Sequence, residues 1–314
     1  MVERVVFFGT PGFAVPTLDA LLGSRYRVVA VVTQPDRPRG RGQKTTDAPV
    51  KARALAAGVP VFQPTDLRNP EFVARLADLQ ADLGVVAAYG RILPDAVLKT
   101  PRLGMINVHA SLLPRYRGAA PVHRAVMAGE HETGVTIMRI VKALDAGPML
   151  AMARRPIGPQ ETSEDVERGL AQLGAELLLR TVDAMSEGTV VETPQVEADA
   201  TYAARITRED GAVDWTEPAR RIHDRIRGLH PWPHASSHLG GGRLILLRSV
   251  ASPELSDAAP GTIVAVDADG LTVATGAGTL VVREVQPEGR RPMSVRDFIA
   301  GHPVAPGARF TGAA

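Results

Sequence analysis

The chain has 314 residues, 45% of them hydrophobic, and a formal net charge of only +2. A chain of this length can bury a sizeable core and is expected to form two domains, and its small net charge means that any nucleic-acid binding must come from local basic clusters. Because the sequence has no cysteine, disulfides, thiolate nucleophiles and cysteine-ligated metals are excluded.

The first nine residues are predicted to enter a strand directly, without the layout of a signal peptide. No apolar run approaches the ~20 residues that a membrane helix needs. We therefore expect a cytoplasmic protein that makes no membrane contact.

Up to about residue 190, short runs rich in β-branched residues alternate with helical patterns. Strands are predicted at residues 5–8, 28–33, 59–62, 83–88, 104–109 and 135–140, and helices at 14–22, 50–57, 70–79 and 120–127. These strands do not alternate apolar with polar residues, and helices separate them. This pattern predicts an α/β fold with a doubly wound, mostly parallel sheet covered on both faces. Ligands in such folds bind beyond the carboxyl ends of the strands.

The first turn, residues 9–14, resembles a nucleotide-binding loop only superficially. It lacks the G-x-G-x-x-G spacing and has Pro11 where the backbone would have to approach a pyrophosphate. A plain glycine turn between strand and helix is favoured over a dinucleotide site.

Residues 34–46 combine several cations with proline and glycine, which predicts an exposed loop rather than a helix or a core strand. Arginine is suited to gripping phosphates, so this loop could be an arm that contacts nucleic acid. The alternative is a solvated charged loop with no partner.

The most informative stretch is residues 104–118. The end of a predicted buried strand carries polar residues at every second position, Asn107, His109 and Ser111. An amide, an imidazole and a hydroxyl therefore point to the same side. The amide can donate to a developing oxyanion, and the imidazole can carry a proton near neutral pH, which suits acyl chemistry. The alternative is a polar strand end whose histidine only bonds its neighbours.

Two more segments are predicted to leave the same sheet edge. Residues 88–94 follow the fourth predicted strand, and residues 139–148 follow the sixth. The second segment carries Asp145 in a turn bounded by glycine and proline, where its carboxylate could orient His109. An Asx turn that caps its own backbone is the alternative.

The second half of the chain changes character. Residues 162–187 predict a long helix that opens with a capping box of Thr162 and Asp165. Residues 191–208 show neither the periodicity of a helix nor that of a strand. They therefore predict a linker between a domain at 1–190 and a domain at 209–314. In the latter, a basic-rimmed helix at 217–229 precedes short β-runs that predict a small barrel. The histidines of residues 230–238 are separated by prolines that forbid an aligning helix, so no metal site is expected.

Residues 107–121, together with Leu144-Asp145-Ala146-Gly147, closely resemble the folate-dependent formyltransferases. Further motifs resemble the members that act on methionine carried by initiator tRNA. These motifs are Phe8-Gly9-Thr10-Pro11, Thr33-Gln34-Pro35-Asp36-Arg37-Pro38, Ala88-Tyr89-Gly90 and Pro231-Trp232-Pro233.

This resemblance implies a Rossmann-like formyltransferase domain followed by an OB-like barrel that assists tRNA binding. It implies 10-formyltetrahydrofolate as the formyl donor, no metal, and a monomer that takes initiator methionyl-tRNA as its partner. The implied catalytic residues are Asn107, His109 and Asp145. The implied folate-binding residues are Arg91, Ile92, Leu93, Ser111, Leu112, Leu113, Pro114, Val141 and Lys142, and the implied tRNA-binding residues are Arg37, Arg39, Arg41 and Lys44.

The sequence departs from the family pattern at Gln43, Lys142 and Pro148, which affects the detail of the expected folate and tRNA contacts rather than the chemistry. Two other functions stay open at this point. One is a formyltransferase that acts on a small amine such as glycinamide ribotide or an amino sugar. The other is a non-catalytic nucleic-acid-binding protein whose polar strand end is structural.

Overall fold

The computed structural model describes residues 1–36, 38–39 and 44–311. The chain divides into two compact units, and each unit is assembled from three segments. The first unit comprises Met1–Pro121, Glu132–Arg155 and Glu167–Ala203, and the second comprises Val122–His131, Pro156–Val166 and Ala204–Ala314.

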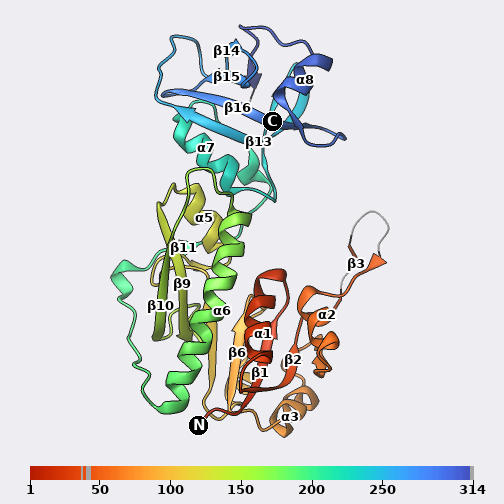
Figure 1. The fold of residues 1–314 in the computed structure, drawn as a ribbon, viewed down its shortest axis with the longest axis vertical. Helices are drawn as coiled ribbons and strands as arrows, with labels where there is room; N and C mark the ends of the chain where they lie inside the picture. The colour runs from red at the N-terminus through yellow and green to blue at the C-terminus, as the bar shows by residue number, and fades with distance from the viewer. Residues whose placement is uncertain (37, 40–43, 312–314) are drawn as a thin grey trace. The chain divides into compact units, whose positions relative to one another are not determined.

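The first unit is built on one sheet with the strand order β10-β9-β7-β6-β1-β2-β5 (Figure 1). Its strands are β1 (Arg4–Gly9), β2 (Arg27–Val32), β5 (Val61–Phe62), β6 (Leu83–Ala87), β7 (Met105–His109), β9 (Glu132–Arg139) and β10 (Met149–Pro156). Four neighbouring pairs are parallel: β5 with β2, β2 with β1, β1 with β6, and β6 with β7. The mostly parallel sheet expected from the sequence is therefore confirmed.

The direction of β9 differs from the expectation. β9 runs antiparallel to β7, and its last residue, Arg139, pairs with Ile106 rather than with His109. The prediction that the segment after this strand leaves the same sheet edge as His109 is therefore wrong. A strand buried on both faces has the same composition in either direction, and an antiparallel strand at the side of a parallel sheet is common.

Helices cover both faces of this sheet. They are α1 (Val15–Leu22), α2 (Pro49–Ala56), α3 (Pro70–Asp78), the short α4 (Asp95–Leu98) and α6 (Ser163–Glu187), of which residues from 167 onward belong to this unit. On one face, Phe8 packs in a buried cluster with Phe72 and Leu76 of α3 and Val97 of α4. On the other, α6 approaches so closely that a Cβ at Gly174 would lie 2.8 Å from Val108 Cγ1.

This packing decides where the polar residues of β7 point. Since Val108 faces α6, its neighbours Asn107 and His109 point to the opposite face, the side on which Met105 joins the buried cluster. Along that side β7 therefore changes from apolar to polar toward its carboxyl end.

The second unit contains an antiparallel sheet with the order β14-β15-β16-β13-β12-β18, with β17 paired to β16. The strands are β12 (Ala235–Leu239), β13 (Gly242–Ser252), β14 (Ile263–Val266), β15 (Leu271–Ala274), β16 (Thr279–Pro287), β17 (Met293–Ser294) and β18 (Phe310–Thr311), with helices α7 (Ala219–Gly228) and α8 (Val295–Gly301). Register shifts on either side of Arg248 mark irregular pairing between β13 and β16. Bulges of this kind bend a strand, and a curled, barrel-like sheet is what the sequence predicts.

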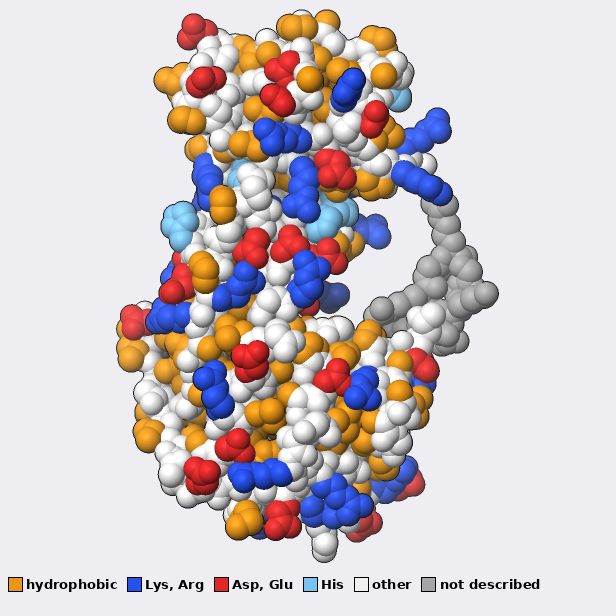
Figure 2. All heavy atoms as spheres, in the orientation of Figure 1, with side chains coloured by type: hydrophobic (Ala, Val, Ile, Leu, Met, Phe, Trp, Pro, Cys, Tyr) orange, Lys and Arg blue, Asp and Glu red, His pale blue; other side chains and the backbone are white. Residues whose placement is uncertain are grey.

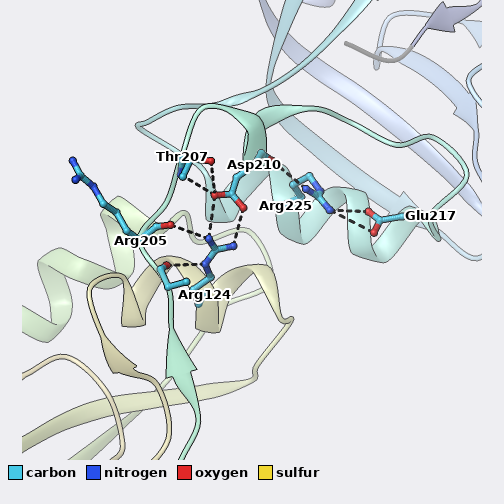
Figure 3. A network of polar contacts seen from close by, with 7 residues as sticks. Arg124, Arg205, Thr207, Asp210, Glu217 and Arg225 are labelled. Carbon is cyan, nitrogen blue, oxygen red and sulfur yellow. Dashed lines mark hydrogen bonds and ion pairs between the residues drawn. The ribbon is translucent and has the colours of Figure 1, made fainter. Parts of the chain in front are cut away.

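Most of α5 (Pro121–Met127) also belongs to the second unit, where its Arg124 joins a polar network (Figure 3). Arg124 donates to both carboxylate oxygens of Asp210, at 2.9 and 3.0 Å, and to the Ala204 carbonyl oxygen at 3.0 Å. The Thr207 amide donates to the same carboxylate at 2.8 Å, and Arg225 donates to the Asp210 carbonyl oxygen at 3.0 Å. Segments remote in sequence are thus joined by one residue, Asp210, through its carboxylate and its backbone carbonyl.

On the face drawn in Figure 2, acidic and basic side chains are intermixed over the surface of each unit. This distribution agrees with the small net charge of the chain. Across the residues that the structure describes, we find no helix with the length and apolar character needed to span a bilayer.

Candidate active site

The side chains of His109 and Asp145 come together in the first unit. His109 Nδ1 lies 3.8 Å from Asp145 Oδ2, and both side chains are largely buried. The other ring nitrogen, Nε2, lies 3.0 Å from the Tyr116 carbonyl oxygen. Because a carbonyl oxygen can only accept a hydrogen bond, Nε2 carries a hydrogen in this contact. An imidazole held between a carbonyl and a carboxylate is suited to holding and passing on a proton.

The Asp145 turn reaches His109 although β9 ends beside Ile106. The chain doubles back after Arg139, and the Arg139 amide bonds to the Pro148 carbonyl oxygen at 2.9 Å. Asp145 itself has φ of +49°, and its Oδ2 accepts a hydrogen bond from the Gly118 amide at 2.8 Å. The carboxylate therefore bonds to a distant part of the chain, in contrast to the self-capping Asx turn.

Asn107 precedes His109 on the same side of β7 and is partly exposed. Its side-chain amide has no hydrogen-bond partner among the described residues. An unpaired, partly exposed amide beside an imidazole can donate to a substrate oxygen, as an oxyanion donor must.

The segment from Ser111 to Pro114 is fixed to β9 by Thr136. The Thr136 hydroxyl donates to the Ser111 carbonyl oxygen at 2.7 Å and accepts from the Leu113 amide at 3.2 Å. Ser111 and Leu113 are buried, and Leu112 and Pro114 are partly exposed. The Ser111 hydroxyl donates to the Arg115 carbonyl oxygen at 2.7 Å, so it folds this segment back on itself.

The two loops that contain the expected folate-binding residues 91–93 and 141–142 carry exposed apolar side chains. Ile92 is 86% exposed, Leu144 57% and Val141 41%, and Lys142 is also exposed. Arg91 donates to the carbonyl oxygens of Pro64 and Thr65, each at 3.0 Å, and Leu93 is buried in the core. Exposed apolar side chains on loops beyond a sheet are common where ligands bind.

The arm proposed to contact tRNA is described only in part. Arg37 and Arg41 lie outside the described residues, whereas the backbone of β3 (Pro38–Arg39) pairs with that of β4 (Lys44–Thr45). The contacts expected of Arg37, Arg39, Arg41 and Lys44 stay predictions.

Within the described part of the chain, no group of three or more His, Asp or Glu side chains is placed to hold a metal ion. His230 and His234, from the histidine-rich segment, have ring centroids 5.1 Å apart, and His230 lies 3.3 Å from Glu164.

Two family models match the chain. The model described as formyl transferase matches residues 3–182, and the model described as the C-terminal domain of formyl transferase matches residues 205–303. The chain belongs to the formyl transferase family.

Two relatives of this formyl transferase carry the same name. The methionyl-tRNA formyltransferase of Trichlorobacter lovleyi is 48% identical over 97% of this chain and 96% of its own length. That of Symbiobacterium thermophilum is 50% identical over 98% of this chain and 95% of its own length.

Solved structures with the same fold are more distant in sequence. An N-formyltransferase from Helicobacter canadensis, solved with folinic acid and dTDP-3-aminofucose, superposes with a TM-score of 0.68 at 16% identity, covering 91% of this chain and 100% of its own. HypX from Aquifex aeolicus, solved with tetrahydrofolic acid, gives a TM-score of 0.62 at 17% identity, covering 95% of this chain and 47% of its own.

The sequence did not indicate three residues that adjoin the site of this formyl transferase. Arg117 is buried, and it contacts Gln195 and Glu197 from the stretch predicted to be a linker. Gln195 in turn contacts the backbone of the Asp145 turn. The position of Arg117 inside the 107–121 motif was the only available signal, because residues 191–203 have no periodicity that would place them.

Proposed function

We propose that this formyl transferase moves the formyl group of 10-formyltetrahydrofolate to the amino group of methionine on initiator tRNA. The observation that carries the proposal is the identity of 48 to 50% with methionyl-tRNA formyltransferases over nearly the whole of both chains. The folates in the distantly related structures support a folate as the donor.

The proposed mechanism uses the three side chains described above. The free amine of methionine attacks the formyl carbon, and the Asn107 amide and the imidazole donate to the resulting oxyanion. His109 passes the proton lost by the amine to N10 of the folate, directly or through water, as the bond from the formyl carbon to N10 breaks. Asp145 orients the ring of His109. The products are N-formylmethionyl-tRNA and tetrahydrofolate.

The remaining assignments belong to the same proposal. Folate is expected to contact residues 91–93, 111–114 and 141–142, and the tRNA acceptor end is expected to contact the cations of the arm. We also propose that the protein is a monomer that works in the cytoplasm, where charged initiator tRNA is used. Gel filtration together with light scattering would test the monomer.

A formyltransferase for a small amine is less well supported. The sugar-modifying enzyme of Helicobacter canadensis shares the fold at only 16% identity, far below the identity with the methionyl-tRNA formyltransferases. A non-catalytic role would not account for the Asp145 carboxylate near the His109 imidazole and for the Asn107 amide, unpaired among the described residues, on the same side of β7.

The experiment that tests the function is a direct assay. The protein is incubated with methionyl initiator tRNA and with 10-formyltetrahydrofolate labelled in the formyl group, and the label on methionine is measured after mild hydrolysis. Parallel reactions offer glycinamide ribotide and a nucleotide-linked amino sugar. Label on methionine alone supports the proposal, and label on either small amine, or on no acceptor, contradicts it.

A further inference from the structure

A single side-chain amide holds the backbone of the Asp145 turn. Gln195 Nε2 donates to the carbonyl oxygens of Asp145 and Gly147, at 2.8 Å each. Asp145 has φ of +49°, a conformation that residues other than glycine rarely adopt and that persists only when the surroundings impose it. The two bonds from Gln195 are part of what imposes it.

Arg117 orients the Gln195 amide. Arg117 Nε donates to Gln195 Oε1 at 3.0 Å, and because a guanidinium can only donate, this bond leaves the NH₂ group of Gln195 toward the turn. Arg117 is only 1% exposed, and its Nη1 bonds to both carboxylate oxygens of Glu197, at 2.9 and 3.1 Å. A planar, buried guanidinium with an ionic partner is a rigid anchor for the amide.

The same short strand also fixes the carboxylate of Asp145. Arg117 and Gly118 form β8, which pairs with β11 (Tyr202–Ala203), and the Gly118 amide is the donor to Asp145 Oδ2. Gly118 has φ of +113°, and a Cβ there would lie 3.0 Å from the Ala203 carbonyl oxygen, so the position requires glycine. Asp145 is therefore held at its carboxylate by β8 and at its backbone by Gln195, which β8 orients.

We propose that Gln195 is a positioning residue for formyl transfer: its two hydrogen bonds keep the Asp145 carboxylate in place beside His109. This inference rests on the proposed function. It gives Gln195, which lies in the stretch predicted to be a linker, a part in the reaction.

Two substitutions distinguish the effect of the NH₂ donors of Gln195 from the effect of its side-chain volume. Gln195→Ala removes the contact with Arg117 and both bonds to the turn. Gln195→Glu keeps the size and an oxygen for Arg117 but replaces the NH₂ donors with an oxygen that faces two carbonyls. Gln172→Ala is the matched control, because Gln172 is exposed on α6 in the same unit.

Both Gln195 variants should lower kcat by about 10- to 100-fold, the loss expected when a catalytic group is displaced by ~1 Å. KM for charged tRNA should stay at the parent value, and the control should match the parent throughout. In a double-mutant cycle, Gln195→Ala should cost little further activity in an Asp145→Asn background, because it acts through Asp145. Parent-like kcat in Gln195→Glu, or a full additional loss in the double variant, would overturn the inference.

Hydrogen exchange followed by mass spectrometry provides a readout independent of turnover. Peptides that cover residues 140–148 should exchange faster in both Gln195 variants than in the parent and in Gln172→Ala, while peptides from β1 and β6 stay unchanged. Unchanged exchange in 140–148 would contradict the proposed contact even if activity fell. If the parent itself formylates no tRNA, the proposed function fails, and the exchange measurement still tests whether Gln195 holds the turn.

Discussion

At the scale of single residues, neighbouring groups among the described residues hold the side chain of His109 in place but leave the side-chain amide of Asn107 free. His109 has an acceptor near each ring nitrogen, whereas the Asn107 amide has no partner in the described part of the chain. An amide with free hydrogens beside a constrained imidazole is the arrangement expected if Asn107 acts only when the oxyanion forms. Asn107 is therefore the residue at which a small chemical change should have a large effect.

Asn107→Asp is expected to lower kcat by roughly 10²–10³-fold, as for the loss of an oxyanion donor. The substitution keeps the size of the side chain but replaces the NH₂ donor with a negatively charged acceptor. Initial rates with saturating folate and charged tRNA measure the effect.

Asn69→Asp provides the matched control for this substitution. Asn69 caps α3, and its Oδ1 accepts from the Glu71 amide at 2.8 Å, a bond that aspartate forms equally well. The control should keep parent activity. Near-normal turnover in Asn107→Asp would remove Asn107 from the mechanism.

At the scale of elements, the second unit depends on polar contacts between segments that are distant in sequence. The network of Figure 3 links α5, the Asp210 turn and α7. Burial favours the neutral acid, but the hydrogen bonds from Arg124 and the Thr207 amide outweigh it and hold the pKa of Asp210 below its ordinary value. The ionised carboxylate is therefore the form that stabilises the fold.

Arg124→Met should lower the free energy of unfolding by about 1–3 kcal/mol, because it leaves part of a half-buried carboxylate unpaired. A carboxyl group with a lowered folded-state pKa contributes stability above its ordinary pKa of about 3.9, and this contribution is lost as the pH falls through the folded-state value. The difference between parent and variant should thus be large at neutral pH and shrink below about pH 4.

Urea unfolding at neutral and acidic pH measures this difference. Arg208→Met, which changes an exposed arginine of the same unit, should be close to the parent. An Arg124→Met variant as stable as this control would show that the network contributes no stability.

His223 of α7 is a second group in this unit whose folded-state pKa is lowered. Its Nδ1 lies 3.0 Å from the Ser249 hydroxyl, and its Nε2 lies 2.9 Å from the Pro159 carbonyl oxygen. Burial, the largest cause, holds the pKa of His223 below its ordinary value. The neutral ring satisfies both contacts, since Nε2 donates and Nδ1 accepts.

Because the folded protein resists a proton that the unfolded chain accepts below about pH 6.5, stability should fall as the pH drops from there toward the folded-state pKa. Between pH 7.5 and 5.5, His223→Gln should lose less of its free energy of unfolding than the parent does, as measured by urea unfolding. His131→Gln, at an exposed position of the same unit, should show the full loss. Equal slopes for the two variants would contradict a neutral buried His223.

At the scale of the whole molecule, the proposed function requires a chain with a net charge of only +2 to recognise a large polyanion, tRNA. Acidic and basic side chains are intermixed on the face that Figure 2 draws. Long-range attraction by bulk charge is thus weak, and local cations have to supply the phosphate contacts. The residue 37–44 segment contributes four such cations, Arg37, Arg39, Arg41 and Lys44.

Arg41→Ala should raise KM for charged tRNA while KM for the folate stays unchanged. The dependence of tRNA binding on salt should also become less steep, because one phosphate contact fewer releases fewer counterions. Binding at several salt concentrations measures the slope, with Arg208→Ala as a control outside the arm. Parent-like KM and salt slope in Arg41→Ala would exclude this arginine as a phosphate contact.

The sequence by itself determined the local features. Runs of β-branched residues located six of the seven strands of the main sheet of the first unit. Thr162 and Asp165, which bond to each other, marked the start of α6, and alternation placed Asn107 and His109 on one side of β7. It did not reveal β10, which is half-buried along its length and lacks a clear alternation, and it could not fix the direction of β9.

Only the tertiary structure decided how the site is assembled. It brought Asp145 to His109 by doubling the chain back after an antiparallel strand, and it joined Gln195 to the Asp145 turn through Arg117. The physical reason is that periodicity reports which face of a single element is buried, whereas strand direction and bonds between distant segments depend on how the whole unit packs.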